Sequence, residues 1–504
     1  MVPLARVQTR GEPRQSYPAA DGSIPFERVR IVLRAKGPPR GDDTMHPAMP
    51  RSRKTKVQRV QPVLNPHAAG ADIGAREIYV AIPVDLDERP VRRFDTFTED
   101  LQQLVAWLKE RGITTLAMEA TSVYWIPLAE LLEAAGIEVC LVNPRHVKNV
   151  PGRKTDVVDC QWLQYLHAIG LLRAAFRPPA QVRAVRALWR HRDALVRHSA
   201  WHIQHMHKAL DQMNLQIHHV IADITGKSGT QIVEAILAGR RDPASLAELG
   251  DQRLRASKAT LRAALTGDYR DEHLFCLRQA YAGYQFVLQQ ITEVDKQLAA
   301  MLAALAAAPA PAEASEPDQT KPKPRPSASN RGQPTYDARG LIARTLGVDL
   351  TTIPGINALT AQTLWAELGS DLNAFKSGKH FASWLSLCPD NRVSGGKVLS
   401  SHTKPSANRA ARALRLAAQG LHHAKNELGD FYRRMRAKLG GAAALVATAH
   451  KLARIVYAVI STRRPYQAEL HTKAEQRRLA RSLQQLRAKA KKLGFELTSA
   501  QQPA

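Results

Sequence analysis

Four acidic residues occupy positions from which their carboxylates could meet. Asp72 follows a short β-type run, and Glu119 ends a later one. Asp156 and Asp159 stand near the start of a predicted helix, where residues three positions apart share a face. Carboxylates gathered within a few ångströms repel one another unless a cation neutralises them. The four acids therefore predict a divalent metal site, although each taken singly is also compatible with a surface charge or a helix cap.

The ligand type indicates which metal and which reaction to expect. Hard oxygen ligands with no nearby Cys or His partner favour Mg²⁺ or Mn²⁺ over Zn²⁺. Two such ions about 4 Å apart can stabilise the attacking and leaving oxygens of phosphoryl transfer. Phosphodiester chemistry is therefore the natural reaction, and Lys154, two residues before Asp156, is well placed to contact a phosphate.

A candidate nucleophile lies in the carboxyl-terminal third of the chain. Ser394 directly precedes two glycines, which permit close backbone approach, and Arg392 and Lys397 supply positive charge where a phosphate could sit. A serine there could attack phosphorus. Ser400 and Ser401 are nearby competitors for this role, and a plain hairpin loop is the structural alternative.

A Pro-Gly turn precedes a predicted helix at Pro354-Gly355. This is the form of a helix-hairpin-helix element, in which backbone N–H groups at the helix start hold a phosphate without reading sequence. A simple turn would have the same sequence, so both interpretations stay open for Gly355.

Five histidines crowd the segment 191–207, and His198 and His202 have the i,i+4 spacing of a metal pair. No acidic or cysteine partner accompanies them in a recognisable pattern. We therefore favour a polar helix that faces nucleic acid over a zinc site.

The elements around the acids predict an α/β layer fold for residues 67–175, because short β-type runs alternate there with helical ones. The order is that of an RNase H-like (RuvC-like) core, in which the strand of Asp72 is central, the strand of Glu119 lies beside it and a helix crosses their ends. The predicted strands are 71–74, 78–84, a short run near 93–94, 115–119 and 137–142, and the predicted helices are 100–111, 125–135 and 156–172.

The rest of the chain is predicted to be mostly helical. Residues 176–305 form a helical, coiled-coil domain with an apolar stripe at helical spacing, and 340–465 form a mostly helical C-terminal domain. A Pro-rich linker, 306–339, separates them. Arginines on the other faces of the first helix are available to nucleic acid. The stripe is Val185, Leu188, Leu195, Met206, Leu210, Met213 and Ile217, and the arginines are Arg183, Arg186, Arg190, Arg192 and Arg197.

Both ends of the chain are basic. Residues 1–66 are rich in Arg, Pro and Gly without an apolar period, which predicts a disordered extension. In the tail 466–504, the basic segment 477–492 has leucines on one side. It is either a surface helix or a segment that lies on nucleic acid.

Composition favours a polyanionic partner. The 504 residues suffice for two or three domains, and 72 Lys+Arg against 45 Asp+Glu give a formal charge of +27. Nucleic acid is the leading candidate; a membrane surface is a minor one, because no run approaches the roughly 20 apolar residues that span a bilayer. Four widely spaced cysteines, with no CxxC pair and no secretory signal, predict unpaired thiols in a reducing cytoplasm.

With these motifs the chain resembles the DEDD transposases of the IS110 family of insertion sequences, including its IS1111 branch, and the related pilin-gene invertases. The resemblance covers about residues 67–465, and its most specific motif is Lys-x-Asp-x-x-Asp after Asn-Pro. The amino extension, the Pro-rich linker and the sequence at 401–406 depart from the usual family pattern. The matching motifs are Gly70–Gly74, Met118–Thr121, Val142–Pro144, Lys154–Asp159, Ile353–Ile356, Pro389–Lys397 and Ala449–Arg454.

The resemblance implies an RNase H-like domain whose acids Asp72, Glu119, Asp156 and Asp159 bind Mg²⁺, and a transposase domain whose Ser394 forms a covalent link to DNA. It also implies a homo-dimer or tetramer and a structured guide RNA that pairs with donor and target DNA. Two alternatives remain from the residues themselves. One is a junction-resolving nuclease that uses water with the same acids, and the other is a non-catalytic nucleic-acid organiser that binds by charge.

Overall fold

The computed structural model describes residues 62–144, 156–307 and 332–495. Of the residues at 156–157 and 469–479 it describes the backbone elements and not the side chains. By contacts between residues the chain divides into Met1–Leu64 and Asn65–Ala504, and the description below concerns the second unit. Lys154, most of the predicted linker and nearly all of the predicted amino extension lie outside the described residues.

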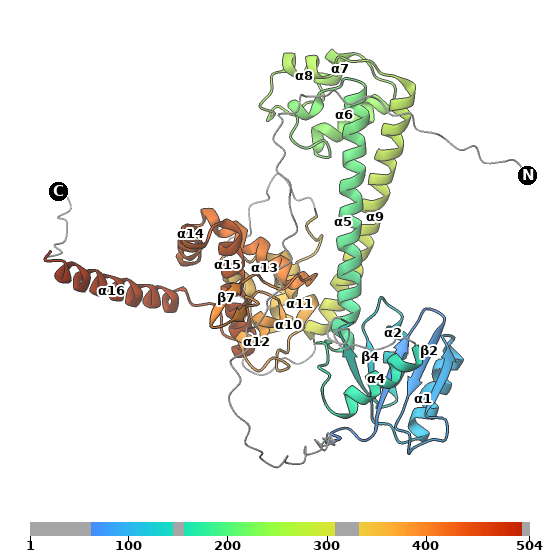
Figure 1. Ribbon diagram of the computed structural model, residues 1–504. Coiled ribbons are helices and arrows are strands. Elements are labelled where there is room, and N and C mark those ends of the chain that lie inside the picture. Colours follow the sequence, from blue (N-terminus) through green and yellow to red (C-terminus); the bar gives the residue numbers. More distant parts are fainter. Residues whose placement is uncertain (1–61, 145–155, 308–331, 496–504) are drawn as a thin grey trace, which may run out of the picture. The chain divides into compact units, whose positions relative to one another are not determined.

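A five-stranded mixed sheet is the core of the predicted α/β region. Its strand order is β3-β2-β1-β4-β5, with β1 antiparallel to β2 and parallel to β4, and β5 parallel to β4. All the predicted strands and helices of this region are present, so the α/β prediction is confirmed (Figure 1). The strands are β1 (Ala68–Ile73), β2 (Glu77–Ala81), β3 (Val91–Asp95), β4 (Thr115–Glu119) and β5 (Glu138–Val142), and the helices are α1 (Thr98–Glu110), α2 (Trp125–Ala134) and α4 (Asp156–Ala168).

The two faces of this sheet are covered by different helices. Side chains alternate between faces along a strand, and Ala69, Ala71 and Ile73 of β1 join Leu116 and Met118 of β4 in one apolar cluster with α1 and α2. The alternate residues of both strands therefore face the other side, where α4 packs against β1. Asp72 and Glu119 belong to this second set.

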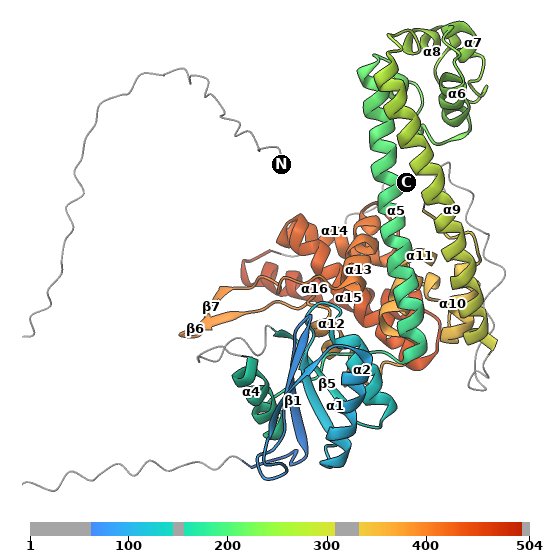
Figure 2. The ribbon, with the colours of Figure 1, turned by 90° about the vertical axis from the view of Figure 1, so that its right-hand side faces the viewer.

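Two long helices, α5 (Ala180–Gln212) and α9 (Asp271–Ala307), pack along each other (Figures 1 and 2). The predicted stripe on α5 is confirmed as packing surface, because Val185, Leu195 and Met206 are buried. His202 packs so closely on α9 that a Cβ at Gly283 would lie 2.2 Å from its ring. Four short elements follow α5 and precede α9 along the chain. They are η1 (Ile217–His219), α6 (Lys227–Leu237), α7 (Pro243–Ala247) and α8 (Lys258–Ala264).

The arginines of α5 are bound to carboxylates. Arg192 is buried and its Nε donates to Asp295 on α9 at 2.5 Å, so the prediction that it is available to nucleic acid is wrong. Solvent does not reach this ion pair, because both side chains lie in the interface between α5 and α9. The other four predicted arginines are also in ion pairs, Arg183 with Glu133, Arg186 and Arg190 with Glu367, and Arg197 with Asp193.

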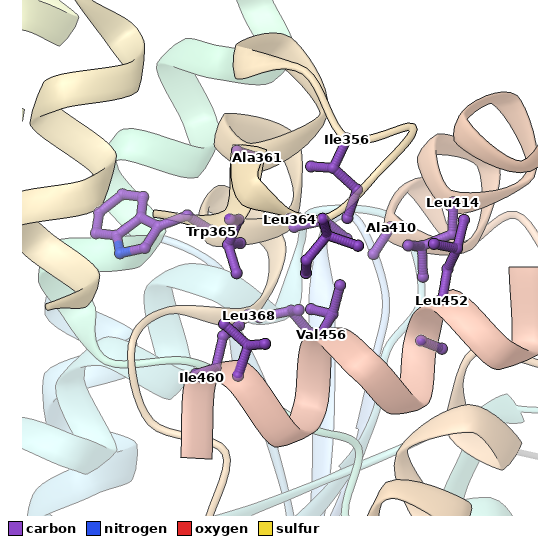
Figure 3. Close-up of a cluster of buried hydrophobic side chains, with 14 of the residues drawn as sticks. Ile356, Ala361, Leu364, Trp365, Leu368, Ala410, Leu414, Leu452, Val456 and Ile460 are labelled. Carbon is purple, nitrogen blue, oxygen red and sulfur yellow. The ribbon is translucent and has the colours of Figure 1, made fainter. Parts of the chain in front are cut away.

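The C-terminal helices enclose one large apolar core. Leu452, Val456 and Ile460 of α15 face side chains of α11 and α13 (Figure 3). The elements are α10 (Ala338–Leu346), η2 (Leu350–Thr352), α11 (Ala358–Leu368), α12 (Gly378–Trp384), β6 (Arg392–Ser394), β7 (Lys397–Ser400), α13 (Arg409–Gly420), η3 (Leu421–His423), α14 (Glu427–Leu439), α15 (Gly441–Thr462) and α16 (Ala468–Lys492).

Helix α15 corrects one prediction from composition. It is long and apolar enough to cross a membrane by length and composition, with 50% of its most apolar window buried. The sequence had suggested that no run approaches this length. Because its buried side chains form the centre of the C-terminal core, the apolar character of α15 is explained by packing between helices.

The four cysteines are unpaired, as predicted. Cys140 and Cys160 are buried, and burial raises the pKa of the Cys140 thiol to about 11. A thiol with so high a pKa stays protonated at neutral pH and is a poor nucleophile. The cytoplasmic location remains a prediction.

Candidate functional site

Asp72 and Glu119 lie next to each other at the ends of neighbouring parallel strands. Ala71 of β1 pairs with Met118 of β4, so the next residue of each strand is one of the two acids. In a parallel pair, residues in register point to the same face. Both acids are half-buried. The sheet thus places two of the four predicted carboxylates together.

Helix α4 lies on this face in unusually close contact with β1. A Cβ at Gly70 would lie 2.2 Å from the backbone nitrogen of Gln164 and 2.4 Å from the carbonyl oxygen of Cys160. The side chain of Gln164 also donates from Nε2 to the carbonyl of Ala68 at 3.2 Å. Only glycine fits at position 70, and its absence of a side chain lets α4 approach the strand that bears Asp72.

The pKa of the Cys160 thiol is influenced by two of the acids. This pKa is raised to about 12, mainly by burial and in smaller part by the charges of Asp72 and Asp159. One of these carboxylates comes from β1 and the other from α4. Both negative charges thus oppose ionisation of this thiol.

The fold brings elements that bear the four predicted acids together, and the role of these acids as a metal site stays a prediction. Asp72, Glu119 and Asp159 come from three elements that meet at one face of the sheet, and Asp156 is the first residue of α4, with its side chain outside those the structure describes. Among the described side chains, no three from His, Cys, Asp and Glu lie close enough to hold a metal ion. This applies also to the histidines of α5, where the preference against a zinc site stays a prediction.

The sequence analysis did not single out two residues at the contact between α4 and β1, Gly70 and Cys160. Gly70 allows the close approach of α4, and the buried Cys160 belongs to the part of α4 whose backbone contacts Gly70. The available signal was a glycine two residues before a strand acid, since glycine inside a strand often marks a close backbone approach.

Ser394 lies at the tip of a β-hairpin. Strands β6 and β7 pair with Ser394 opposite Lys397, and Gly395 and Gly396 form the two-residue turn with φ of +55° and +75°. Positive φ at both central residues is typical of a type I′ turn, which glycine adopts without strain. The hairpin alternative is confirmed as local structure, and a chemical role for Ser394 stays a prediction.

The hairpin exposes apolar side chains as well as the serine. Val393, Val398 and Leu399 have exposed fractions of 58%, 59% and 71%, and Arg392, Ser394 and Lys397 are also exposed. At the base of the β6–β7 hairpin, the backbone N–H of Asp390 donates to the carbonyl oxygen of His402 at 2.9 Å. Of the competing serines, Ser400 is half-buried and Ser401 is exposed.

The Pro-Gly turn before α11 is present as predicted. Gly355 has φ of +90°, and a Cβ there would lie 3.0 Å from the carbonyl oxygen of Ala417 on α13. Asn357 caps α11 by accepting from the backbone N–H of Thr360 at 2.8 Å. Packing on α13 explains the glycine, and its contact with nucleic acid remains a prediction.

Comparison with known proteins gives two matches to family models. One, described as a transposase, covers residues 69–215, and the other, described as the transposase IS116/IS110/IS902 family, covers residues 349–433. The chain is also 32% identical over 99 residues to the insertion element IS110 uncharacterized 43.6 kDa protein of Streptomyces coelicolor. That alignment covers 19% of this chain and 24% of the relative.

Proposed function

Since this chain belongs to the IS110 family of transposases, we propose that it cuts and rejoins DNA by phosphoryl transfer, with Asp72, Glu119, Asp156 and Asp159 as one half of the site and Ser394 as the other. The first family match contains the four acids and the second contains the serine. The main structural support is the contact of α4 with β1 at Gly70, beside which Asp72 and Asp159 act on the same thiol. The strand order also supports an RNase H-like domain.

The acids fit a hard divalent cation, Mg²⁺ or Mn²⁺. Their donors are all oxygens, and the nearest sulfur, Cys160, is held as a neutral thiol because burial raises its pKa to about 12. A neutral thiol is a poor metal ligand, so the donor set stays oxygen-only. When bound, the cation would polarise the phosphoryl oxygens and stabilise the charge that develops on them. Lys154, just before α4, would contact the phosphate.

Ser394 would be the nucleophile. Its Oγ attacks phosphorus, an Oγ–P bond forms as the bond to one DNA oxygen breaks, and a carboxylate of the site accepts the serine proton. A DNA hydroxyl then attacks the serine phosphodiester and releases Ser394. Arg392 and Lys397 flank the serine on the exposed hairpin, where their charges would hold the phosphate.

The test is a search for a covalent protein–DNA adduct under denaturing conditions. With Mg²⁺, the parent chain should form the adduct, and Ser394→Ala should abolish both the adduct and strand joining while DNA binding persists. Ser401→Ala is the matched control, because this serine is also exposed and close in sequence. Asp72→Asn should likewise prevent adduct formation. Strand joining by Ser394→Ala would rule out Ser394 as the nucleophile.

The same assay separates the alternative functions. A nuclease that uses water with the same acids would cut DNA in the presence of Mg²⁺ and leave no adduct on the parent chain. A non-catalytic organiser would bind DNA with steep salt dependence and would be indifferent to Asp72→Asn and to Mg²⁺. Either result would contradict the proposed recombination.

We also propose that the active form is an oligomer with a structured guide RNA, for which the support is the family resemblance and the exposed aromatic residues of the long helices. Trp201 on α5 and Phe286 on α9 have exposed fractions of 54% and 59%. Sedimentation of the chain before and after ribonuclease treatment tests both parts. A monomer that carries no RNA and still forms the adduct would contradict them.

A further inference from the structure

Another basic surface, among the C-terminal helices, contains none of the predicted site residues. It is a groove of about 1050 Å³ between the start of α12, helices α14 and α15, and the segment that leads into α16. Lys379, Lys451, Arg454 and Arg464 line it, and no Asp or Glu is among the described residues of the lining. We call it the Arg454 groove.

Three cations of the Arg454 groove, Lys379, Arg454 and Arg464, differ from the arginines of α5 in their ion pairing among the described residues. Lys379, Arg454 and Arg464 are exposed, and within the described part of the chain none of the three forms an ion pair with a carboxylate. By contrast, Arg192 and Arg190 of α5 are held by Asp295 and Glu367. The groove charges are therefore available to an external anion.

Two further features show the positive field inside the groove. The Lys451 ammonium lies 4.4 Å from the centroid of the Phe431 ring, and the Arg434 guanidinium lies 5.8 Å from it. Burial lowers the pKa of His450, and the charge of Arg454 lowers it further. The Lys451 ammonium on the Phe431 ring adds positive charge to this wall of the groove.

Positive charge continues beyond the groove. Gln467 is the last lining residue, and α16 begins at the next position. The described side chains at 480–495 are nearly all exposed and include five cations and no acid. These cations lie in the second half of α16, beyond residues 468–479, whose sequence includes Glu469 and Glu475.

We propose that the Arg454 groove binds the phosphate backbone of a nucleic-acid strand, a proposal that rests on the proposed function for its class of partner. A concave surface with cations on several elements fits a strand that can enter it better than a flat lipid surface. Backbone contacts of this kind position nucleic acid and do not read its sequence.

The test is binding by the full-length chain without divalent metal, measured by fluorescence anisotropy over a range of salt concentrations. The variant is Lys379→Gln/Arg454→Gln/Arg464→Gln. The matched control, Arg240→Gln/Arg255→Gln/Arg278→Gln, removes three exposed cations near α6 to α9. The probes are short single-stranded DNA, single-stranded RNA and duplex DNA, together with vesicles of anionic lipid.

The groove variant should bind nucleic acid about 100-fold more weakly at about 0.1 M salt, and its slope of log K against log salt should fall by about 2 for a single strand and about 3 for a duplex. A loss with one probe alone identifies DNA or RNA as the ligand. Binding equal to that of the control, or a loss confined to vesicles, would overturn the proposal. Because no metal is present, these results stand apart from adduct formation, whose failure would contradict the proposed function alone.

Discussion

Replacing Gly70 by alanine tests whether the close packing of α4 on β1 sets the geometry of the acids. The added methyl group would lie 2.2 Å from the backbone nitrogen of Gln164, whereas ordinary van der Waals contact begins at 3.4 Å. The second near atom, the Cys160 carbonyl oxygen, also belongs to the backbone of α4. Rotation of a side chain cannot relieve either clash, so helix and strand must separate by about 1.2 Å.

This displacement acts directly on the candidate site, because Asp72 stays with the strand while Asp159 moves with the helix. A misplacement of about 1 Å at a reacting centre lowers the rate by about 100-fold. Overpacking of a well-packed interface destabilises by about 1–3 kcal/mol. We therefore expect Gly70→Ala to form the serine adduct about 100-fold more slowly and to unfold at lower urea concentration.

Gly136→Ala supplies the control for stability. Gly136 has φ of +79° and a Cβ there meets nothing within 4 Å, so alanine is strained by about 1–2 kcal/mol without displacing α4. The two variants should lose similar stability in urea unfolding, and only Gly70→Ala should lose adduct formation in a single-turnover assay with Mg²⁺. If both variants form the adduct at the parent rate, the contact at Gly70 does not position the acids.

Three further perturbations follow from single residues. Asp295→Asn should lower the free energy of unfolding by about 3–5 kcal/mol in urea, because Arg192 would stay buried without its counter-charge; a loss under about 1 kcal/mol would contradict this. The side-chain hydrogen bond from Trp107 and the backbone hydrogen bond from Arg89 lower the pKa of Asp87 to about 2, below the unfolded value near 3.9. The stabilisation by the ionised Asp87 is therefore complete above about pH 5 and is lost as pH falls toward 2. The free energy of unfolding of Asp87→Asn should depend less on pH over that range, which urea unfolding followed by circular dichroism measures. Gly396→Val should weaken the β6–β7 hairpin, because φ is +75° there, so amide exchange in the hairpin should speed up and adduct formation should fall while the urea midpoint stays unchanged.

The α/β elements could be predicted because their patterns are local. Alternation of side chains and the lengths of the apolar runs located the strands β1 to β5 and the helices α1, α2 and α4. The main error was the start of β1, which begins at Ala68 and not at Ala71. Ala68, Ala69 and Gly70 are small and carry little apolar signal, yet they are buried because α4 packs directly on the strand. Small residues were needed there for a contact that is remote in sequence.

The candidate site was predictable only in its residue types and strand positions. The parallel pairing of β1 and β4 follows from the α/β order, so the neighbourhood of Asp72 and Glu119 could be expected, whereas the residue register is seen in the structure alone. The distance between α4 and the sheet could not be expected, since it depends on Gly70 against Gln164. For the segment that bears Ser394, a hairpin loop was one of the local alternatives. The positive φ angles of Gly395 and Gly396 show that it is a hairpin.

The distribution of charge is the feature that sequence alone predicts least well. A formal charge of +27 indicates a polyanionic partner, but it does not say which cations the fold neutralises. The arginine-rich face of α5 had been the expected nucleic-acid surface, and its members pair with acids, some of them distant in sequence. Lys379, Arg454 and Arg464 have no periodic relation, yet folding gathers them around one groove. Because a carboxylate neutralises much of the charge of the cation that it binds, we expect the groove to contact a phosphate backbone more strongly than the α5 surface does.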